Sequence, residues 1–182
     1  MCGAVNDLVR NGVVVVVSAG NSGAAGTLTG GSSDVSGQLS TITDPGNAAE
    51  AITVGSTHRF APHMYGISYT SSKGPTLDGR LKPDLVAPGE RITSAATGAM
   101  RDGVKPLVGT PEAATYIEDS GTSMAAPHVS GAIAAFLSVR SEFIGQPDEV
   151  KRMFCENATS LGRHEFFQGA GLLDLMRVLS NV

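Results

Sequence analysis

The feature that most constrains the fold is a run of five valines, Val13 to Val17, near the start of the chain. Successive side chains of a β-strand point to opposite faces, so an all-valine strand is apolar on both faces. Such a strand is typical of the centre of a parallel sheet that helices cover on both sides. A segment with helical spacing of its apolar residues, 3–11, precedes the run and ends at Asn11-Gly12. The run therefore predicts an α/β fold whose partner strands precede residue 1 in a longer protein.

The remaining elements follow from periodicity and from turn residues. Residues 122–139 carry apolar side chains nearly all round a helix, which is typical of a buried helix. Residues 20–47 are rich in Gly, Ser, Thr and Asp, and we expect a loop there. The other expected elements are strands at 51–55, 67–70, 85–87 and 92–94, an irregular hairpin at 98–118, and helices at 148–156 and 173–179.

Composition argues against several classes of function. The net charge is −4 and no basic block occurs, so nucleic acid is not an expected partner. The two cysteines, Cys2 and Cys155, are too few for a disulfide framework or a zinc site, although a single bridge between them stays open. No His-x-x-x-His or carboxylate cluster predicts a metal-dependent hydrolase. The longest apolar run is too short to cross a membrane and no signal peptide is recognisable, so no membrane partner is expected and the localisation stays unknown.

Ser123 lies at the expected start of the long helix. Pro127 fits only the first turns of a helix and Gly121 allows a sharp approach, so both place the helix start close to Ser123. Free N–H groups and the macrodipole at a helix N-terminus stabilise a developing negative charge. A nucleophile whose substrate becomes an oxyanion needs this environment. A serine at a helix start usually serves only as a cap, so this position alone does not decide between the two roles.

Longer strings of residues separate the two roles. The segment GTSMAAPHVSG, residues 121–131, resembles the nucleophile signature of subtilases, the subtilisin-like serine proteases of peptidase family S8. The segment VVVVSAGNSG, residues 14–23, is similar to the strand and loop that carry the oxyanion-hole asparagine in that family. Three further segments resemble the family in the same order, namely residues 69–75, 81–89 and 169–174. The sequence is therefore identified as similar to the C-terminal part of a subtilase catalytic domain.

The resemblance implies roles for particular residues. It makes Ser123 the nucleophile, and Asn21 a donor to the oxyanion beside the backbone N–H of Ser123. Ser18, Ala19 and Gly20 would line a wall of the primary specificity pocket. Judged alone, Asn21 in Asn-Ser-Gly is typical of a turn. The implied fold is the C-terminal portion of a three-layer α/β/α sandwich with a mainly parallel sheet, so residues 1–182 are expected to form a single, incomplete domain. The chemistry requires no cofactor; calcium is common in the family, but no segment here predicts a calcium loop.

The proton-transfer part of the triad has no recognisable motif in this chain. In the family the catalytic aspartate and histidine precede the oxyanion strand, so their segments would lie before residue 1. The chain has four histidines. His58 and His63 are expected in one loop and His164 in a surface loop, and His128 lies about 140° round the helix from Ser123. None of them is a good candidate for the general base.

Two functions from different classes follow. The first is a serine endopeptidase that acts on polypeptides through a Ser123 acyl-enzyme and needs the missing N-terminal half of the domain as a partner. The second is a non-catalytic or degenerate module that binds peptide or is inactive alone. Because a serine hydroxyl without a base is a weak nucleophile, we expect little peptidase activity from the isolated chain. Its apolar strand, Val13–Val17, would also form an exposed sheet edge through which copies associate.

Overall fold

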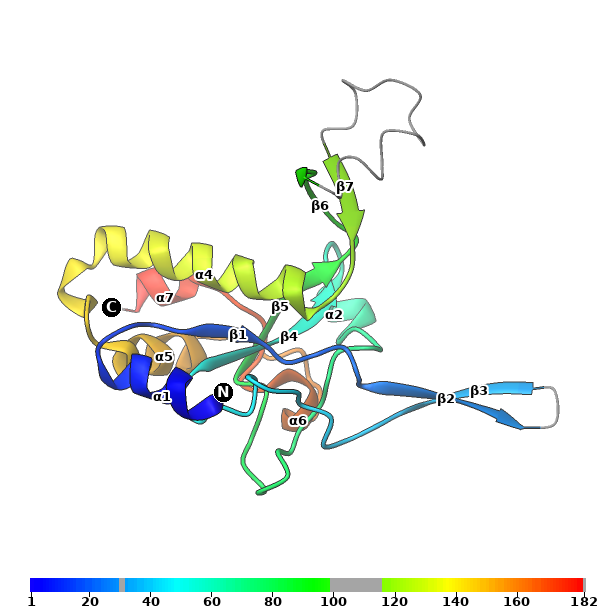
Figure 1. Cartoon of the computed structure of the whole chain (residues 1–182). Coiled ribbons are helices and arrows are strands. Elements are labelled where there is room, and N and C mark those ends of the chain that lie inside the picture. The colour runs from blue at the N-terminus through cyan, green and yellow to red at the C-terminus, as the bar shows by residue number, and fades with distance from the viewer. Residues whose placement is uncertain (30–31, 99–115, 182) are drawn as a thin grey trace.

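The computed structural model describes residues 1–29, 32–98 and 116–181. Three parallel strands form the central sheet in the order β1-β4-β5 (Figure 1). They are β1 (Val16–Ser18), β4 (Ile52–His58) and β5 (Leu85–Glu90). β4 therefore has a neighbour on each side, and its first six residues are buried. This arrangement confirms the expected α/β class.

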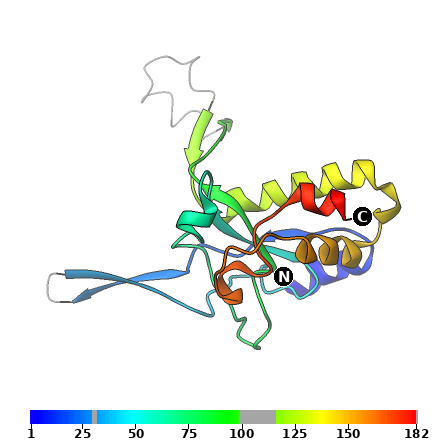
Figure 2. The same ribbon diagram turned by 180° about the vertical axis from the view of Figure 1, so that it is seen from behind.

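The valine run separates two helical layers, as its pattern predicts. Val14 and Val16 pack against the main core beside α4 (Thr122–Val139). Val15 and Val17 belong to a second apolar cluster, which includes Val5 of α1 (Cys2–Arg10). Because consecutive valines face different clusters, α4 and α1 lie on opposite faces of the sheet (Figures 1 and 2). The three-layer α/β/α arrangement follows from this alternation.

The run is shorter as a strand than its composition predicts. β1 begins at Val16, and Val15 contributes only its carbonyl, which accepts a hydrogen bond of 2.9 Å from Ile52 N–H. Within the described residues β1 pairs with β4 alone, so it is an edge strand and not a central one. Val13 is 46% exposed at the start of this edge. If a second strand paired with the free edge of β1, the strand could extend from Val16 back toward Val13.

The exposed edge of β1 predicts self-association when the chain is expressed alone. Unpaired backbone groups beside valine side chains favour pairing with the same edge of a second copy. Multi-angle light scattering should show a mass above that of one chain, rising with concentration. Replacing the exposed Val13 by lysine should lower this mass, because a charge on an edge strand opposes pairing. A monomer at every concentration would contradict the expectation.

α4 covers the sheet with one face only. Its buried residues lie at helical spacing, whereas Pro127, His128, Gly131 and Ala135 are exposed. The expectation of burial all round is therefore wrong, because three strands cover only one side of so long a helix. By length and composition α4 could also span a membrane, although its buried residues pack on the sheet as those of a core helix do. The residues of α4 that are buried are Thr122, Ala125, Val129, Ala132, Ile133 and Phe136.

The C-terminal helices complete the core. Phe136 of α4 meets Phe154 of α5 (Pro147–Glu156) edge to face, with ring centroids 5.6 Å apart. Val178 of α7 (Leu175–Ser180) is fully buried in the same cluster. The expected helices at 148–156 and 173–179 are thus confirmed to within two residues. Three short helices escape the sequence pattern, namely α2 (Pro62–Tyr65), η1 (Ser141–Phe143) and α6 (Glu165–Gln168).

Two antiparallel pairs project from the body of the molecule (Figure 1). β2 (Ala24–Thr29) pairs with β3 (Ser32–Gly37), so the loop expected over 20–47 contains a hairpin. β6 (Ile92–Ala95) pairs with β7 (Tyr116–Asp119), which confirms strand at the end of the hairpin expected over 98–118. Residues 99–115 of that hairpin lie outside the described residues. The strand expected at 67–70 is wrong, because only Ile67 forms an isolated bridge, to Thr57.

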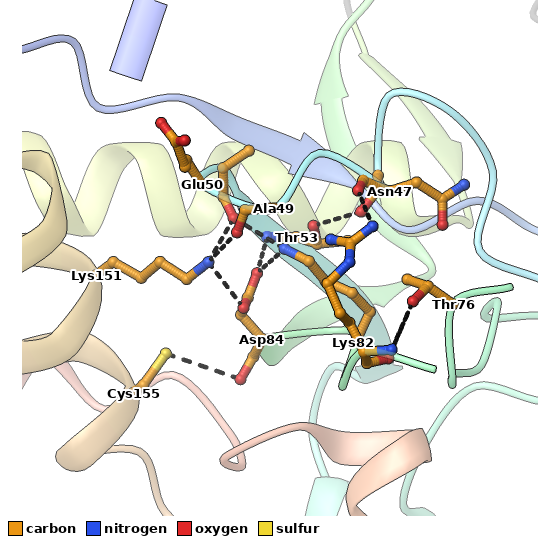
Figure 3. A network of polar contacts seen from close by, with 12 residues as sticks. Asn47, Ala49, Glu50, Thr53, Thr76, Lys82, Asp84, Lys151 and Cys155 are labelled. Atoms are coloured by element: carbon orange, nitrogen blue, oxygen red, sulfur yellow. Dashed lines mark hydrogen bonds and ion pairs between the residues drawn. The ribbon is translucent and has the colours of Figure 1, made fainter. Parts of the chain in front are cut away.

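A buried ion network joins α5 to the sheet (Figure 3). The carboxylate of Asp84 accepts hydrogen bonds from Lys82 Nζ at 2.6 Å and from Thr53 N–H at 2.7 Å. Lys151 of α5 reaches the second carboxylate oxygen of Asp84 at 3.0 Å. Burial lowers the pKa of Lys82 to about 8, although the Asp84 carboxylate opposes that shift. Burial also raises the pKa of the neighbouring Cys155 thiol to about 11. This network holds together the segment that leads into β5.

Candidate active site

The candidate site forms where the loop after β1 meets the N-terminus of α4. The side-chain oxygen of Asn21 accepts hydrogen bonds from Thr122 N–H at 2.9 Å and from Thr122 Oγ1 at 3.1 Å. Thr122 Oγ1 in turn accepts a hydrogen bond of 3.1 Å from Gly20 N–H. Two segments about a hundred residues apart are joined by these bonds. Asn21 thus lies beside the first turn of the Ser123 helix.

The contact with Thr122 determines which way the Asn21 amide points. A backbone N–H can only donate, so the atom facing Thr122 N–H must be the amide oxygen and not the nitrogen. Nδ2, the donor end of Asn21, therefore does not face Thr122 N–H. A Cβ built on Gly121 would lie 3.0 Å from Asn21 Nδ2. The backbone at Gly121 therefore comes close to the Asn21 side chain, and glycine leaves room for that approach. Asn21 as a whole residue is exposed.

Ser123 is the second residue of α4 and is exposed. N–H groups in the first turn of a helix have no intrahelical partner, so the N–H of Ser123 is free to donate. Pro127 has no N–H, which removes the hydrogen bond that the Ser123 carbonyl would otherwise accept four residues later. Ser123 lines two open pockets, one of about 480 Å³ beside β6 and one of about 520 Å³ beside β1. Ser123 thus borders two concave surfaces.

The structure brings only part of the expected pocket wall near Ser123. Ser18, the last residue of β1, is half-buried and lines the 520 Å³ pocket together with Ser123. The side chain of Ala19 is fully buried, and its N–H donates to Val54 O at 2.9 Å. Gly20 has a φ of +103°, and a side chain there would collide with Thr43 Oγ1 at 2.3 Å. The specificity role of these three residues stays a prediction.

Three of the four histidines make hydrogen-bond contacts away from Ser123. Nδ1 of His128 lies 2.8 Å from Met124 O, a contact within the helix. Nδ1 of His58 accepts hydrogen bonds from the N–H groups of Phe60 and Ala61 at 3.3 and 3.2 Å. His164 caps α6 by accepting a hydrogen bond from Phe166 N–H, so it does not lie in a plain surface loop as expected.

His63 lies on the short helix α2 and not in a loop. Within the described residues, none of the four histidines hydrogen-bonds Ser123.

Thr122 is the site residue that sequence reasoning missed. It precedes the nucleophile candidate in the string Gly121-Thr122-Ser123, and the family resemblance implies no separate role for it. Its hydroxyl bridges Gly20 N–H and the Asn21 amide oxygen while its side chain is buried. The sequence signal is a threonine directly before a serine at a helix start, since hydroxyl side chains commonly bond neighbouring backbone groups.

No group of three or more His, Cys, Asp or Glu side chains in the described part of the chain is placed to hold a metal ion. The groups that the described residues bring to the site are the serine, the amide and the helix N-terminus. Such a site can stabilise a negatively charged tetrahedral oxygen next to a hydroxyl nucleophile.

Comparison with known proteins bears on the family of the chain. The sequence model of the subtilase family matches residues 1–172. The chain is 35% identical to pyrolysin of Pyrococcus furiosus, over 96% of this chain and 13% of pyrolysin. It is 32% identical to the serine protease AprX of Bacillus subtilis, over 89% of this chain and 34% of AprX. The chain thus spans about a third or less of the length of these two relatives.

Solved structures of subtilisin-like proteases have the same fold as this chain. Fervidolysin from Fervidobacterium pennivorans, described as a keratinolytic enzyme related to subtilisin, is 26% identical, with a TM-score of 0.69. That alignment covers 99% of this chain and 24% of fervidolysin. The prenylagaramide maturation protease PagA has the same fold at 20% identity and a TM-score of 0.69, over 98% of this chain and 54% of PagA. Since the family match extends over nearly its whole length, the chain belongs to the subtilase family.

Proposed function

We propose that this chain is the nucleophile and oxyanion-hole half of a serine endopeptidase. The observation that carries the proposal is the bond between Thr122 N–H and the Asn21 amide oxygen, because it joins Asn21 to the first turn of the Ser123 helix and leaves the amide nitrogen as the end that does not bond Thr122. The membership in the subtilase family supports the protease class. A polypeptide is then the substrate.

The proposed reaction follows from the orientation of these groups. Ser123 Oγ attacks the carbonyl carbon of the scissile peptide bond and gives its proton to a base. The carbonyl oxygen becomes negatively charged, and Asn21 Nδ2 and Ser123 N–H donate hydrogen bonds to it. The intermediate collapses when the leaving amine takes the proton from the base, which leaves an ester on Ser123. Water then attacks this ester by the same route and regenerates the hydroxyl.

The base and its orienting carboxylate would come from the N-terminal half of the domain. A groove of about 310 Å³ runs between β1 and α4 and is lined by apolar residues such as Val14, Val16 and Ile133. It continues the exposed edge of β1, where a further parallel strand would find unpaired backbone groups. We infer that the missing half docks along this edge and brings its proton-transfer residues to the 520 Å³ pocket beside Ser123.

A non-catalytic role is the second candidate. It is favoured by the histidines, since none in the described residues hydrogen-bonds Ser123. In that case the pocket between β6 and Ser123 would hold an extended peptide without cleaving it. The two candidates differ in whether Ser123 ever becomes a strong nucleophile.

A fluorophosphonate probe should separate the candidates, because it reacts only with an activated serine. We expect little labelling of the isolated chain and strong labelling once the N-terminal half is present, detected by mass spectrometry as an adduct on Ser123. A Ser123→Ala variant of the complete protein is the control and should not be labelled. Equal, weak labelling of the complete protein and its Ser123→Ala variant would favour the non-catalytic role.

A further inference from the structure

A buried lysine contacts the loop that carries Asn21. Lys73 is 7% exposed, and its ammonium nitrogen contacts three backbone carbonyl oxygens. The acceptors are Gly23 O at 2.9 Å, Tyr69 O at 2.8 Å and Ser71 O at 2.9 Å. An ammonium group has three N–H donors and a neutral amine has only two, so three acceptors are all satisfied only by the charged form. Burial lowers the pKa of Lys73 below its ordinary value. The three carbonyls therefore enclose a cation that the chain itself supplies.

The cation bridges two segments. The Asn21 loop, defined here as residues 20–23, lies against the segment 69–73. Gly20 O accepts a hydrogen bond of 2.8 Å from Ser72 N–H, and Gly23 N–H donates to Thr70 O at 2.9 Å. Ser22 N–H donates to Ser72 Oγ at 3.1 Å. The hydrogen bond from Lys73 Nζ to Gly23 O adds a fourth contact, at the last residue of the Asn21 loop. The residues on both sides of Asn21 are thus held by the same short segment.

Gly23 shows how close the two segments are. A Cβ added there would lie 1.9 Å from Ser71 O and 2.4 Å from Lys73 Nζ. Any side chain at residue 23 would therefore displace either the backbone or the ammonium. Lys73 is itself anchored, since its N–H donates to Thr41 Oγ1 at 2.9 Å and its carbonyl accepts a hydrogen bond of 2.9 Å from Thr41 N–H. A fixed cation can hold the Asn21 loop, whereas a mobile surface lysine could not.

We propose that Lys73 is a positioning residue for Asn21, and that its ammonium acts as a tethered cation that clamps the Asn21 loop onto the segment 69–73. The catalytic consequence rests on the proposed function of Asn21 as an oxyanion donor, but the clamp itself does not. The Asn21 side chain is held at its oxygen by Thr122, and its backbone is held by the clamp. Both restraints are needed to keep Nδ2 in one position, because donor geometry in an oxyanion hole must be preorganised.

Hydrogen exchange tests the clamp in the chain itself. In Lys73→Met, which keeps most of the apolar stem and removes the charge, exchange of Ser22 N–H and Gly23 N–H should be faster by on the order of tenfold or more. Exchange of Thr53 N–H in the central strand should stay the same. Lys82→Met is the comparison variant, since Lys82 is also buried but bonds Ala51 O and Asp84, so in this variant exchange should be accelerated at Thr53 N–H at least as much as in the Asn21 loop. In Lys73→Met, unchanged exchange in the Asn21 loop, or acceleration there no greater than at Thr53 N–H, would overturn the proposal.

Chemical rescue tests the tethered cation. Lys73→Ala removes three carbons and the ammonium group, which n-propylammonium would replace atom for atom. Added n-propylammonium should restore slow exchange in the Asn21 loop of Lys73→Ala and have no effect on Lys73→Met, whose stem fills the space. Tetramethylammonium at equal ionic strength carries the charge without an N–H donor and should not rescue. Rescue by both ions, or by neither, would count against a cation that acts through hydrogen bonds.

The catalytic consequence is measured in the complete enzyme. Lys73→Met should lower kcat and leave KM unchanged, because the oxyanion forms only in the transition state. n-Propylammonium should raise kcat of Lys73→Ala. If Asn21→Ala lowers kcat and Lys73→Met does not, the positioning role is wrong. If Asn21→Ala itself leaves kcat unchanged, the proposed oxyanion role fails, and the exchange experiments alone then decide whether the clamp exists.

Discussion

Replacing Asp84 by alanine should destabilise the chain by about 3–5 kcal/mol, because it removes the only carboxylate in the described part of the buried network. The side chain of Lys82 is 2% exposed and that of Asp84 is 11% exposed, so water cannot replace the lost partner. Without Asp84, the ammonium groups of Lys82 and Lys151 would share Ala51 O, at 3.0 and 2.9 Å, with nothing to separate their charges. Thr53 N–H would also lose its acceptor.

The unfolding midpoint in urea measures this loss, with Glu149→Ala as the control. Glu149 pairs with Arg152 on the exposed face of α5, where an ion pair contributes little, so its midpoint should stay close to that of the unmodified chain. Asp84→Asn should lie between the two, since an amide can still accept from Thr53 N–H but carries no charge. If Asp84→Ala unfolds at the same urea concentration as Glu149→Ala, the buried network does not stabilise the fold.

The parts of the fold that the sequence predicts well depend on local patterns. The helix that carries Ser123 begins at Thr122, as Pro127 and Gly121 predict, because both residues restrict the backbone where they stand. The alternating burial of the valine run follows from strand geometry in the same way. Both features can be predicted from neighbouring residues alone.

The parts that could not be predicted depend on partners far away in the sequence. The hairpin of β2 and β3 consists largely of Gly, Ala, Ser and Thr, a composition that is typical of loops, so only the pairing itself reveals it. Residues 67–70 have the composition of a strand, yet Thr70 accepts its hydrogen bond from Gly23, which lies in the loop after β1. Lys82 and Asp84 stand in a segment rich in turn residues, and nothing local shows that their charges are buried.

The same limit applies to the candidate site. The family resemblance predicts Ser123 and Asn21 but not the contacts between them, which run through Thr122. The structure adds that the amide oxygen of Asn21 accepts hydrogen bonds from Thr122, so the proposed donor role belongs to Nδ2. Because the oxygen of the Asn21 amide bonds Thr122 and the nitrogen has the proposed donor role, substitutions can test the two ends separately.

Replacing Asn21 by alanine in the complete enzyme should lower kcat by about 10²–10³ and leave KM nearly unchanged, the magnitude known for the loss of one oxyanion-hole donor in subtilisin. The substrate carbonyl is neutral when it binds and acquires its negative charge only at the transition state. A donor directed at that charge therefore contributes to kcat and not to ground-state binding. Steady-state kinetics on a peptide ester and a peptide amide measure both constants.

Asn21→Asp separates the two functions of the Asn21 side chain. A carboxylate still accepts the hydrogen bonds from Thr122 N–H and Thr122 Oγ1, and its charge is favourable at a helix N-terminus, so the helix start should be preserved. It has no N–H to donate, however, and its negative charge would repel the oxyanion. We therefore expect Asn21→Asp to keep the thermal midpoint of the unmodified enzyme and to lose at least as much kcat as Asn21→Ala. If Asn21→Asp retained full activity, Asn21 would be a helix cap and not an oxyanion donor.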